Sequence, residues 1–203
     1  MIKLGILAST RATDMQAIID AIESKKLDAR ISIVISNKED AYALERARKH
    51  NIDAVFVNPK GLKREEFDNE VNKVLDKHNV DLVLLIGYMR ILSNSFVTKW
   101  KNRLMNIHPS LLPDFAGSMD MDVHAAVLKS GIKFTGCTLH FVDENVDSGP
   151  IILQKKVNID KNETAGSLKE KVQKAEQEII IKGIKLFGES KIVVKNSKAE
   201  ILE

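Results

Sequence analysis

Residues 2–8 (Ile-Lys-Leu-Gly-Ile-Leu-Ala) set the pattern of the fold, because their nearly continuous apolar run predicts a buried β-strand. A polar turn follows, and apolar residues then recur at helical spacing from Met15 to Ile22. Strand and helix alternate in the same way up to residue 86, with strands expected over 30–36, 53–57 and 80–86 and helices over 40–49 and 63–78. This alternation predicts an α/β fold with a single, doubly wound, mostly parallel sheet and helices on both faces.

The second half of the chain predicts a different edge to the sheet. Strands are expected over 132–142 and 150–157, joined by the acidic turn 143–149, which suits an antiparallel C-terminal edge. Helices are expected over 123–130 and 164–182, the first preceded by a mobile loop over 114–122. In the tail, 188–203, the apolar run 192–194 suggests a further edge strand.

Composition narrows the class of protein. The 203 residues are 44% hydrophobic and 29% charged with a net charge of +3, which is ordinary for a globular domain and too weak for a nucleic-acid footprint. No stretch approaches a membrane span, and the N-terminus is too soon polar for a signal peptide, so we expect a cytoplasmic protein. The single Cys137 suits a buried structural thiol, and no Cys/His spacing indicates a metal.

Two loops that follow strands carry candidate binding groups. In the turn 9–14, Thr13 or Asp14 is a good N-cap, and free backbone N–H groups at the helix start would attract a phosphate. The alternative is an ordinary capped turn. The loop 87–92 (Gly-Tyr-Met-Arg-Ile-Leu) is apolar enough to line a slot for a heterocycle, or it packs on the core.

The stretch 104–113 (Leu-Met-Asn-Ile-His-Pro-Ser-Leu-Leu-Pro) holds the candidate catalytic pair. Proline favours a strand end at His108, and residues two apart on a strand share a face, so Asn106 and His108 would point the same way. Such a pair can polarise and protonate a carbonyl, although a strand end with polar capping groups explains the triplet alone. Loops 9–14, 87–92 and 108–113 all follow strands and are expected at one sheet edge.

The turn 143–149 supplies a candidate acid. If Asp147 folds back on His108, its charge raises the pKa of the imidazole by favouring the cation. The alternative is a solvated hairpin turn.

Three motifs in register, 87–92, 106–113 and 140–152, strongly resemble the phosphoribosylglycinamide formyltransferases, folate-dependent enzymes of de novo purine synthesis. The resemblance covers residues 1–187 and implies one Rossmann-like formyltransferase domain, with 188–203 as its tail. It also implies transfer of a formyl group from 10-formyltetrahydrofolate, a cosubstrate, to the amine of 5-phosphoribosylglycinamide, without a metal.

The resemblance assigns roles to particular positions. The implied catalytic residues are Asn106, His108 and Asp147, with Asn106 and His108 stabilising the oxyanion and Asp147 keeping His108 cationic near neutral pH. The implied formyl-folate residues are Arg64, Met89, Arg90, Ile91, Leu92 and Asn106. The implied residues for the substrate are Ala12, Thr13, Asp14, Gln173 and Glu176, although the last two alone suggest a solvated helix face.

The chain departs from the family pattern at two places. Residues 10–14 replace a glycine-rich loop, so Ala12 restricts the backbone where glycine would permit positive φ, Asp14 adds a negative charge, and Arg11 is a possible compensation. Residues 117–124 are longer and more acidic than usual, which leaves the role of His124 open. We expect small-molecule partners rather than a nucleic acid or a membrane, in a monomer or a homodimer.

Alternative functions are a formyltetrahydrofolate hydrolase and a non-catalytic folate- or nucleotide-binding module. The hydrolases usually carry an extra N-terminal domain and replace Pro109, and a binding module would not need both donors and the acid. A methionyl-tRNA formyltransferase would want a further C-terminal domain and a basic surface, for which 203 residues leave no room.

Overall fold

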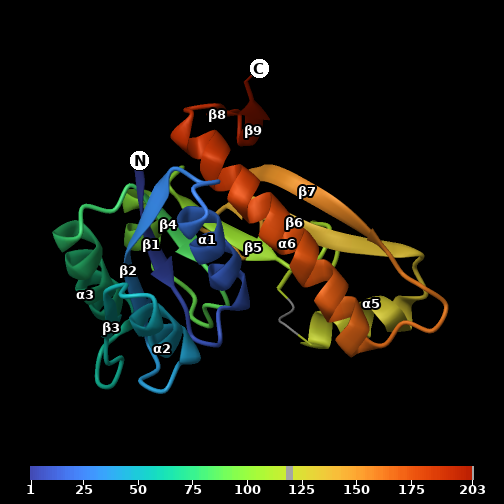
Figure 1. The fold of residues 1–203 in the computed structure, drawn as a ribbon, viewed down its shortest axis with the longest axis horizontal. Coiled ribbons are helices and arrows are strands. Elements are labelled where there is room, and N and C mark those ends of the chain that lie inside the picture. Colours follow the sequence, from blue (N-terminus) through green and yellow to red (C-terminus); the bar gives the residue numbers. More distant parts are fainter. Residues whose placement is uncertain (118–120, 203) are drawn as a thin grey trace. The chain divides into compact units, whose positions relative to one another are not determined.

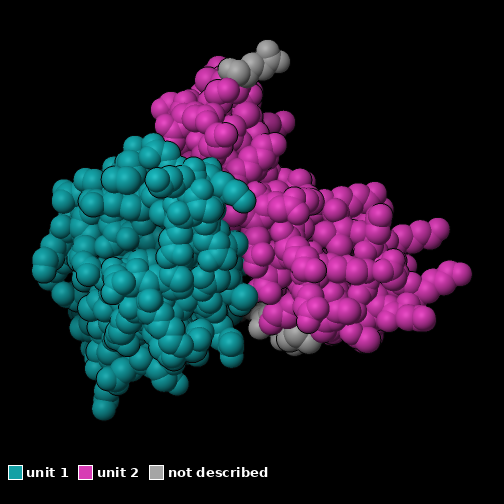
Figure 2. All heavy atoms as spheres, viewed as in Figure 1, with its two compact units in different colours: residues 1–106 teal, residues 107–203 magenta. Residues whose placement is uncertain are grey.

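The computed structural model describes residues 1–117 and 121–202, and it divides into two compact units. Unit 1 comprises residues 1–106 and unit 2 residues 107–203 (Figure 2). The division falls inside a strand, not near residue 187, and the assignment of 1–187 to one domain stays a prediction. The expected loop 114–122 lies partly outside the described residues, since 118–120 are not among them.

Unit 1 alternates strand and helix as predicted (Figure 1). Its elements are β1 (Ile2–Leu7), α1 (Thr13–Glu23), β2 (Ala29–Ser36), α2 (Tyr42–Lys49), β3 (Ala54–Phe56), α3 (Arg64–Lys77), β4 (Leu82–Leu85), α4 (Asn94–Lys99) and β5 (Leu104–His108), the last of which ends in unit 2. The strands are parallel in the order β3-β2-β1-β4-β5. The six-residue α4 was not predicted.

The strand order puts helices on both faces of this sheet. From β1 to β3 the chain moves one way along the sheet, and from β3 to β5 it moves back past β1. Because such crossovers are right-handed, α1 and α2 cover one face and α3 and α4 the other. Accordingly, α1 contacts α2, and α3 contacts α4. Leu4, Ile6, Val83 and Leu84 are fully buried between these layers.

Unit 2 contains the antiparallel edge. Its elements are α5 (Met121–Ser130), β6 (Phe134–Phe141), β7 (Ile151–Asn158), α6 (Ala165–Gly188), β8 (Ile192–Lys195) and β9 (Lys198–Ile201). As predicted, β6 and β7 pair antiparallel and complete the sheet order β3-β2-β1-β4-β5-β6-β7. The long helix α6 packs on β6, β7 and α5.

The tail forms a structure of its own. The apolar run 192–194 is a strand, as expected, but β8 pairs with β9 in a separate two-stranded sheet instead of joining the larger one. None of the helices in residues 1–117 and 121–202 has both the length and the apolar character that a membrane crossing needs.

Candidate active site

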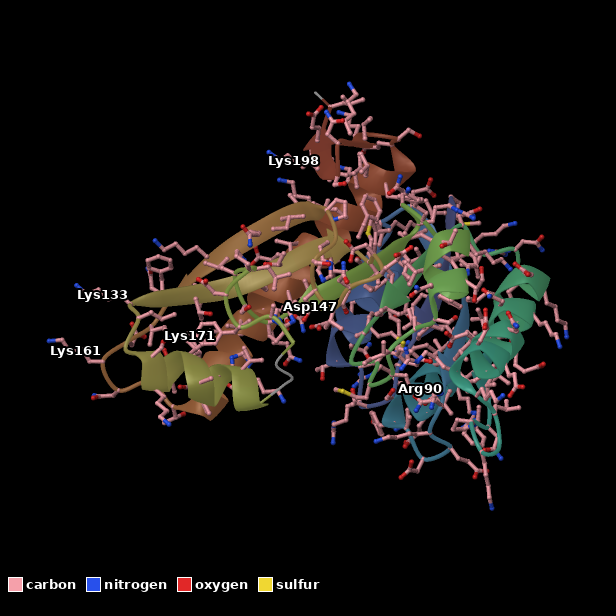
Figure 3. The ribbon with its side chains drawn as sticks, turned by 180° about the vertical axis from the view of Figure 1, so that it is seen from behind. Arg90, Lys133, Asp147, Lys161, Lys171 and Lys198 are labelled. Carbon is pink, nitrogen blue, oxygen red and sulfur yellow. The ribbon has the colours of Figure 1, made fainter. Side chains whose placement is uncertain are left out.

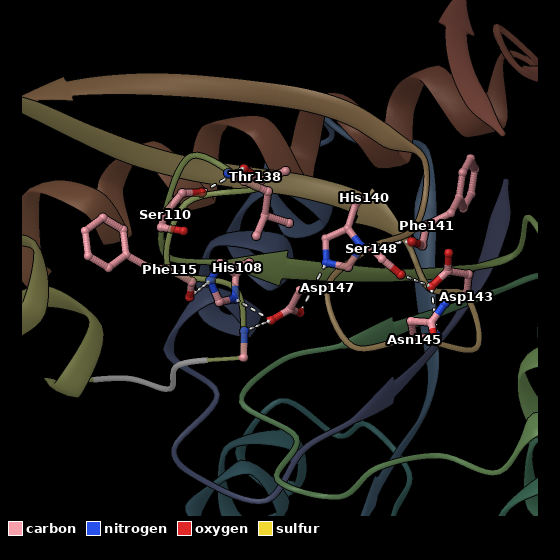
Figure 4. A network of polar contacts seen from close by, with 12 residues as sticks. His108, Ser110, Phe115, Thr138, His140, Phe141, Asp143, Asn145, Asp147 and Ser148 are labelled. Carbon is pink, nitrogen blue, oxygen red and sulfur yellow. Dashed lines mark hydrogen bonds and ion pairs between the residues drawn. The ribbon is translucent and has the colours of Figure 1, made fainter.

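A buried His-Asp-His cluster lies where β5 ends and the turn after β6 folds back (Figure 4). His108 Nδ1 lies 3.3 Å from Asp147 Oδ2, and His140 Nε2 lies 3.7 Å from Asp147 Oδ1. The side chains of His108 and His140 are only 5% and 2% exposed, and that of Asp147 is 11% exposed. The contact between Asp147 and His108 that the sequence suggested is therefore present, and the solvated-turn alternative is wrong for Asp147.

Backbone hydrogen-bonding groups also contact His108, His140 and Asp147, and they fix the orientation of these side chains. His108 Nε2 lies 3.2 Å from the Phe115 carbonyl oxygen, and His140 Nδ1 lies 2.8 Å from that of Phe141. The Gly117 N–H donates to Asp147 Oδ2 at 2.9 Å. Both ring nitrogens of His108 thus face acceptors, an arrangement that satisfies the imidazolium form.

Hydrogen bonds from β6 and β7 hold the loop that follows His108. Thr138 and Gln154 are opposite each other across the two strands. The Thr138 hydroxyl donates to the Ser110 carbonyl at 2.7 Å (Figure 4) and accepts from the Leu112 N–H at 3.0 Å. Gln154 donates to the Leu112 carbonyl at 2.9 Å. Residues 110–112 are therefore fixed to rigid strands.

Opposing effects act on the pKa of the buried His108 imidazole. Burial lowers the pKa of His108 below its usual value, and although Asp147 and the Phe115 carbonyl each raise it, they do not offset burial. The prediction that Asp147 raises the pKa holds for its own effect. The prediction that Asp147 keeps the imidazole cationic near neutral pH stays a prediction. Burial raises the pKa of Asp147, but the hydrogen bonds from His140 and Gly117, together with the charge of His108, lower it below its usual value overall.

In unit 1, the loops after β1 and β4 are joined. The Ser9 N–H donates to the Gly87 carbonyl at 3.0 Å, and the Ser9 hydroxyl accepts from the Met89 N–H at 2.8 Å and donates to Asn37 at 2.6 Å. Asn106 is half-buried and pairs with Leu85 at the same end of the sheet. Two of the three loops expected at one edge thus meet, whereas loop 108–113 belongs to unit 2 and its place with them stays a prediction.

Gly87 makes this junction possible. Its φ is +60°, and a Cβ there would lie 2.3 Å from the Thr10 hydroxyl oxygen. A larger residue would therefore have to displace the Thr10 hydroxyl while adopting a backbone conformation that side chains disfavour.

The turn before α1 differs from the prediction. The N-cap is Ala12 rather than Thr13 or Asp14, and it makes no side-chain capping hydrogen bond. Ala12 adopts a left-handed conformation with φ +45° although it has a Cβ, which costs about 1–2 kcal/mol. Thr13 is exposed, and Asp14 is 7% exposed in the first turn of α1.

The residues implied for formyl-folate all lie in unit 1. Arg64 is exposed at the start of α3, and Arg90 (labelled in Figure 3) stacks its guanidinium 4.2 Å from the centre of the Phe67 ring. Met89 and Ile91 are 38% and 57% exposed, whereas Leu92 is buried. The end of the loop therefore packs on the core, and its middle is an exposed apolar surface. The expected slot for a heterocycle stays a prediction.

The remaining candidates lie on the helices of unit 2. Gln173 is half-buried on α6, and Glu176 is only 8% exposed, so a solvated face is wrong for Glu176. His124 is buried on α5.

The sequence analysis assigned no role to His140, which is buried on β6. Its place in the apolar run 132–142, which predicts a buried strand, was a signal that could have marked it as a buried titratable group. Within the described part of the chain, no group of three or more His, Cys, Asp and Glu side chains could hold a metal.

Comparison with known proteins identifies the family. Residues 2–184 match the family model described as formyl transferase. The chain belongs to the formyl transferase family.

Relatives of this formyl transferase differ greatly in length. The chain is 38% identical over 200 residues to phosphoribosylglycinamide formyltransferase of Haemophilus influenzae. The match covers 98% of this chain and 93% of that protein. It is 41% identical over 187 residues to the human trifunctional purine biosynthetic protein adenosine-3, covering 92% of this chain. The chain spans only 18% of that protein's length.

A solved structure agrees over the full chain. Glycinamide ribonucleotide transformylase 1 from Symbiobacterium toebii superposes with a TM-score of 0.95 at 39% identity. The match covers 100% of this chain and 95% of that one.

Proposed function

We propose that this chain transfers a formyl group from 10-formyltetrahydrofolate to the amine of 5-phosphoribosylglycinamide in de novo purine biosynthesis. The observation that carries the proposal is the buried His108–Asp147 pair at the end of β5, in a chain of the formyl transferase family. The near full-length match to a phosphoribosylglycinamide formyltransferase supports the choice of acceptor.

The chemistry needs no group beyond these side chains. The amine nitrogen attacks the formyl carbon, the formyl oxygen takes negative charge, and the bond from carbon to folate N10 then breaks while the amine proton moves to N10. Asn106 and His108 Nε2 donate to the oxyanion, His108 Nε2 turning to it from the Phe115 carbonyl that it faces in this structure. Removing one such donor typically costs about 10²–10³ in kcat. Asp147 stabilises the imidazolium through Nδ1, which opposes the effect of burial.

The binding roles follow the same assignment. Formyl-folate is a cosubstrate held by Arg64 and residues 89–92, with Asn106 at the formyl group. The phosphate of the acceptor binds the N–H groups of residues 12–14. Gln173 and Glu176 of α6 bind the same substrate near that phosphate. The exposed apolar side chains of Met89 and Ile91 support a planar ligand on loop 87–92.

We place the enzyme in the cytoplasm as a monomer or a homodimer that acts on small molecules. Net charge of +3 supports small-molecule partners over a nucleic acid.

One assay tests the function. Purified protein is incubated with 10-formyltetrahydrofolate with and without glycinamide ribonucleotide, and tetrahydrofolate and formylated product are measured. We expect both products, in equal amounts, only when the ribonucleotide is present. Tetrahydrofolate formed without the amine would indicate a hydrolase, and folate binding without turnover would indicate a binding module.

A further inference from the structure

Asp68 is a buried carboxylate to which no role has yet been given. It lies on α3 with 1% exposure, and its Oδ2 accepts the backbone N–H of Ser93 at 2.6 Å. Ser93 is the N-cap of α4, and its hydroxyl accepts the Phe96 N–H. A single carboxylate therefore fixes the first turn of α4 to α3, directly after the end of loop 87–92.

The surroundings of Asp68 hold two arginines of the proposed folate site. Burial raises the pKa of Asp68, while the Ser93 hydrogen bonds and the charges of Arg90 and Arg64 lower it in part. Arg64 precedes Asp68 by four residues and so lies on the same face of α3. Arg90 stacks on Phe67, the neighbour of Asp68.

Three buried polar atoms in this region have no hydrogen-bond partner among the described residues: Asp68 Oδ1, Arg90 Nε and Tyr88 Oη. The negative charge of Asp68 also acts on Tyr88, whose pKa is raised mainly by burial. A buried carboxylate is costly unless it is paired, so packing alone does not account for an aspartate here.

We propose that Asp68 is a positioning residue for the formyl-folate cosubstrate, which it serves by anchoring loop 87–92 through Ser93 and by orienting Arg90 and Arg64. The inference rests on the proposed function and extends it, since Asp68 acts through these residues and does not touch the ligand.

The test separates folate binding from the other steps. Asp68→Asn keeps an oxygen for the Ser93 N–H and removes the negative charge that interacts with the charges of the two arginines. We expect the Kd of a stable deaza analogue of the formyl-folate, measured by calorimetry, and the KM for 10-formyltetrahydrofolate to rise about tenfold, as for other residues that act through a network. The KM for the ribonucleotide and kcat should stay within about twofold.

Asp76→Asn is the matched control. Asp76 also lies on α3 and pairs with Lys99 of α4 at 2.6 Å, but it is exposed. Loss of general α3–α4 packing would affect both variants, whereas positioning of the cosubstrate affects only Asp68→Asn. Equal rises in folate Kd for the two variants, or an unchanged Kd in a folded Asp68→Asn, would overturn the proposal.

A measurement on the unaltered protein covers the case in which Asp68→Asn does not fold. Saturating deaza analogue should slow hydrogen exchange at the Ser93 amide, because the anchored loop is then held by the ligand. Unchanged exchange at Ser93 overturns the role of Asp68. Absence of formyl transfer in the unaltered enzyme contradicts the proposed function instead, so the two failures are distinguishable.

Discussion

His108 is a buried imidazole whose proton affinity differs between the folded and unfolded chain. Because burial lowers its folded pKa, the unfolded chain binds the proton more readily, and stability is lost as pH falls below about 6.5. The ionised Asp147 stabilises the fold because its pKa is lowered. This stabilisation is lost only at more acid pH, as the pH falls below the usual range of a carboxyl group. We expect the free energy of unfolding in urea to fall between pH 7 and pH 5, and to fall less in His108→Gln. Equal slopes for the two proteins would contradict this.

Asp147→Asn tests the partner of this imidazole. The amide keeps the size of the side chain but removes the charge that favours the imidazolium, so we expect kcat to fall about 100-fold or more. Tm should fall only slightly, because the stabilising charge of Asp147 is lost while the side chain still fills its site. Initial rates of formyl transfer and a thermal melt measure the two effects. Unchanged activity would remove Asp147 from the mechanism.

At this scale the sequence predicted one contact of the candidate site better than the electrostatics of that site. The contact between His108 and Asp147 was predicted because motif and spacing are local features of a chain, whereas the catalytic roles of Asn106, His108 and Asp147 stay predictions. The net direction of the His108 pKa was not predicted, because it depends on burial by the loop to Phe115 and by β6. His140 was missed for the same reason, since its contact with Asp147 exists only once β6 is in place.

The turn between β6 and β7 is the element that carries Asp147, and its geometry depends on Gly149. A Cβ on Gly149 would lie 1.9 Å from the Phe141 carbonyl oxygen, which is backbone and cannot move aside. We expect Gly149→Ala to displace the turn, reducing kcat at least tenfold and stability by about 1–3 kcal/mol. Steady-state kinetics and urea unfolding test this.

The matched control is Gly166→Ala in the first turn of α6. A Cβ there meets only the Thr164 hydroxyl oxygen, at 3.8 Å, so activity and stability should hold. Equal effects of the two substitutions would show that the close approach at Gly149 is unimportant.

Most elements were predictable, because strands and long helices carry strong periodicity. The exceptions were short or strained. The six residues of α4 span less than two turns, too few to show a period, and its start depends on the Ser93–Asp68 contact across 25 positions. Ala12 became the N-cap of α1 in a backbone conformation that propensity argues against.

At the scale of the whole molecule, the parallel sheet and its antiparallel edge followed from the order of the elements. The division into two units did not, because it falls between Asn106 and Ile107 inside an apolar strand, where no proline, glycine or charged linker marks a boundary. The β8–β9 hairpin was also missed as a pair, since four-residue strands give little alternation.

Removal of this hairpin tests where the catalytic domain ends. The hairpin closes on itself, with the Leu202 N–H donating to the Lys191 carbonyl, and its side chains are half-buried or exposed, although β9 also contacts β7. We expect a chain ending at residue 190 to keep its kcat and both KM values. Its Tm should fall by only a few degrees, since a loss of about 1 kcal/mol corresponds to roughly 2–4 °C in a chain of this size. A truncated chain that is unfolded or inactive would place the hairpin within the catalytic domain, because β7 would then depend on β9.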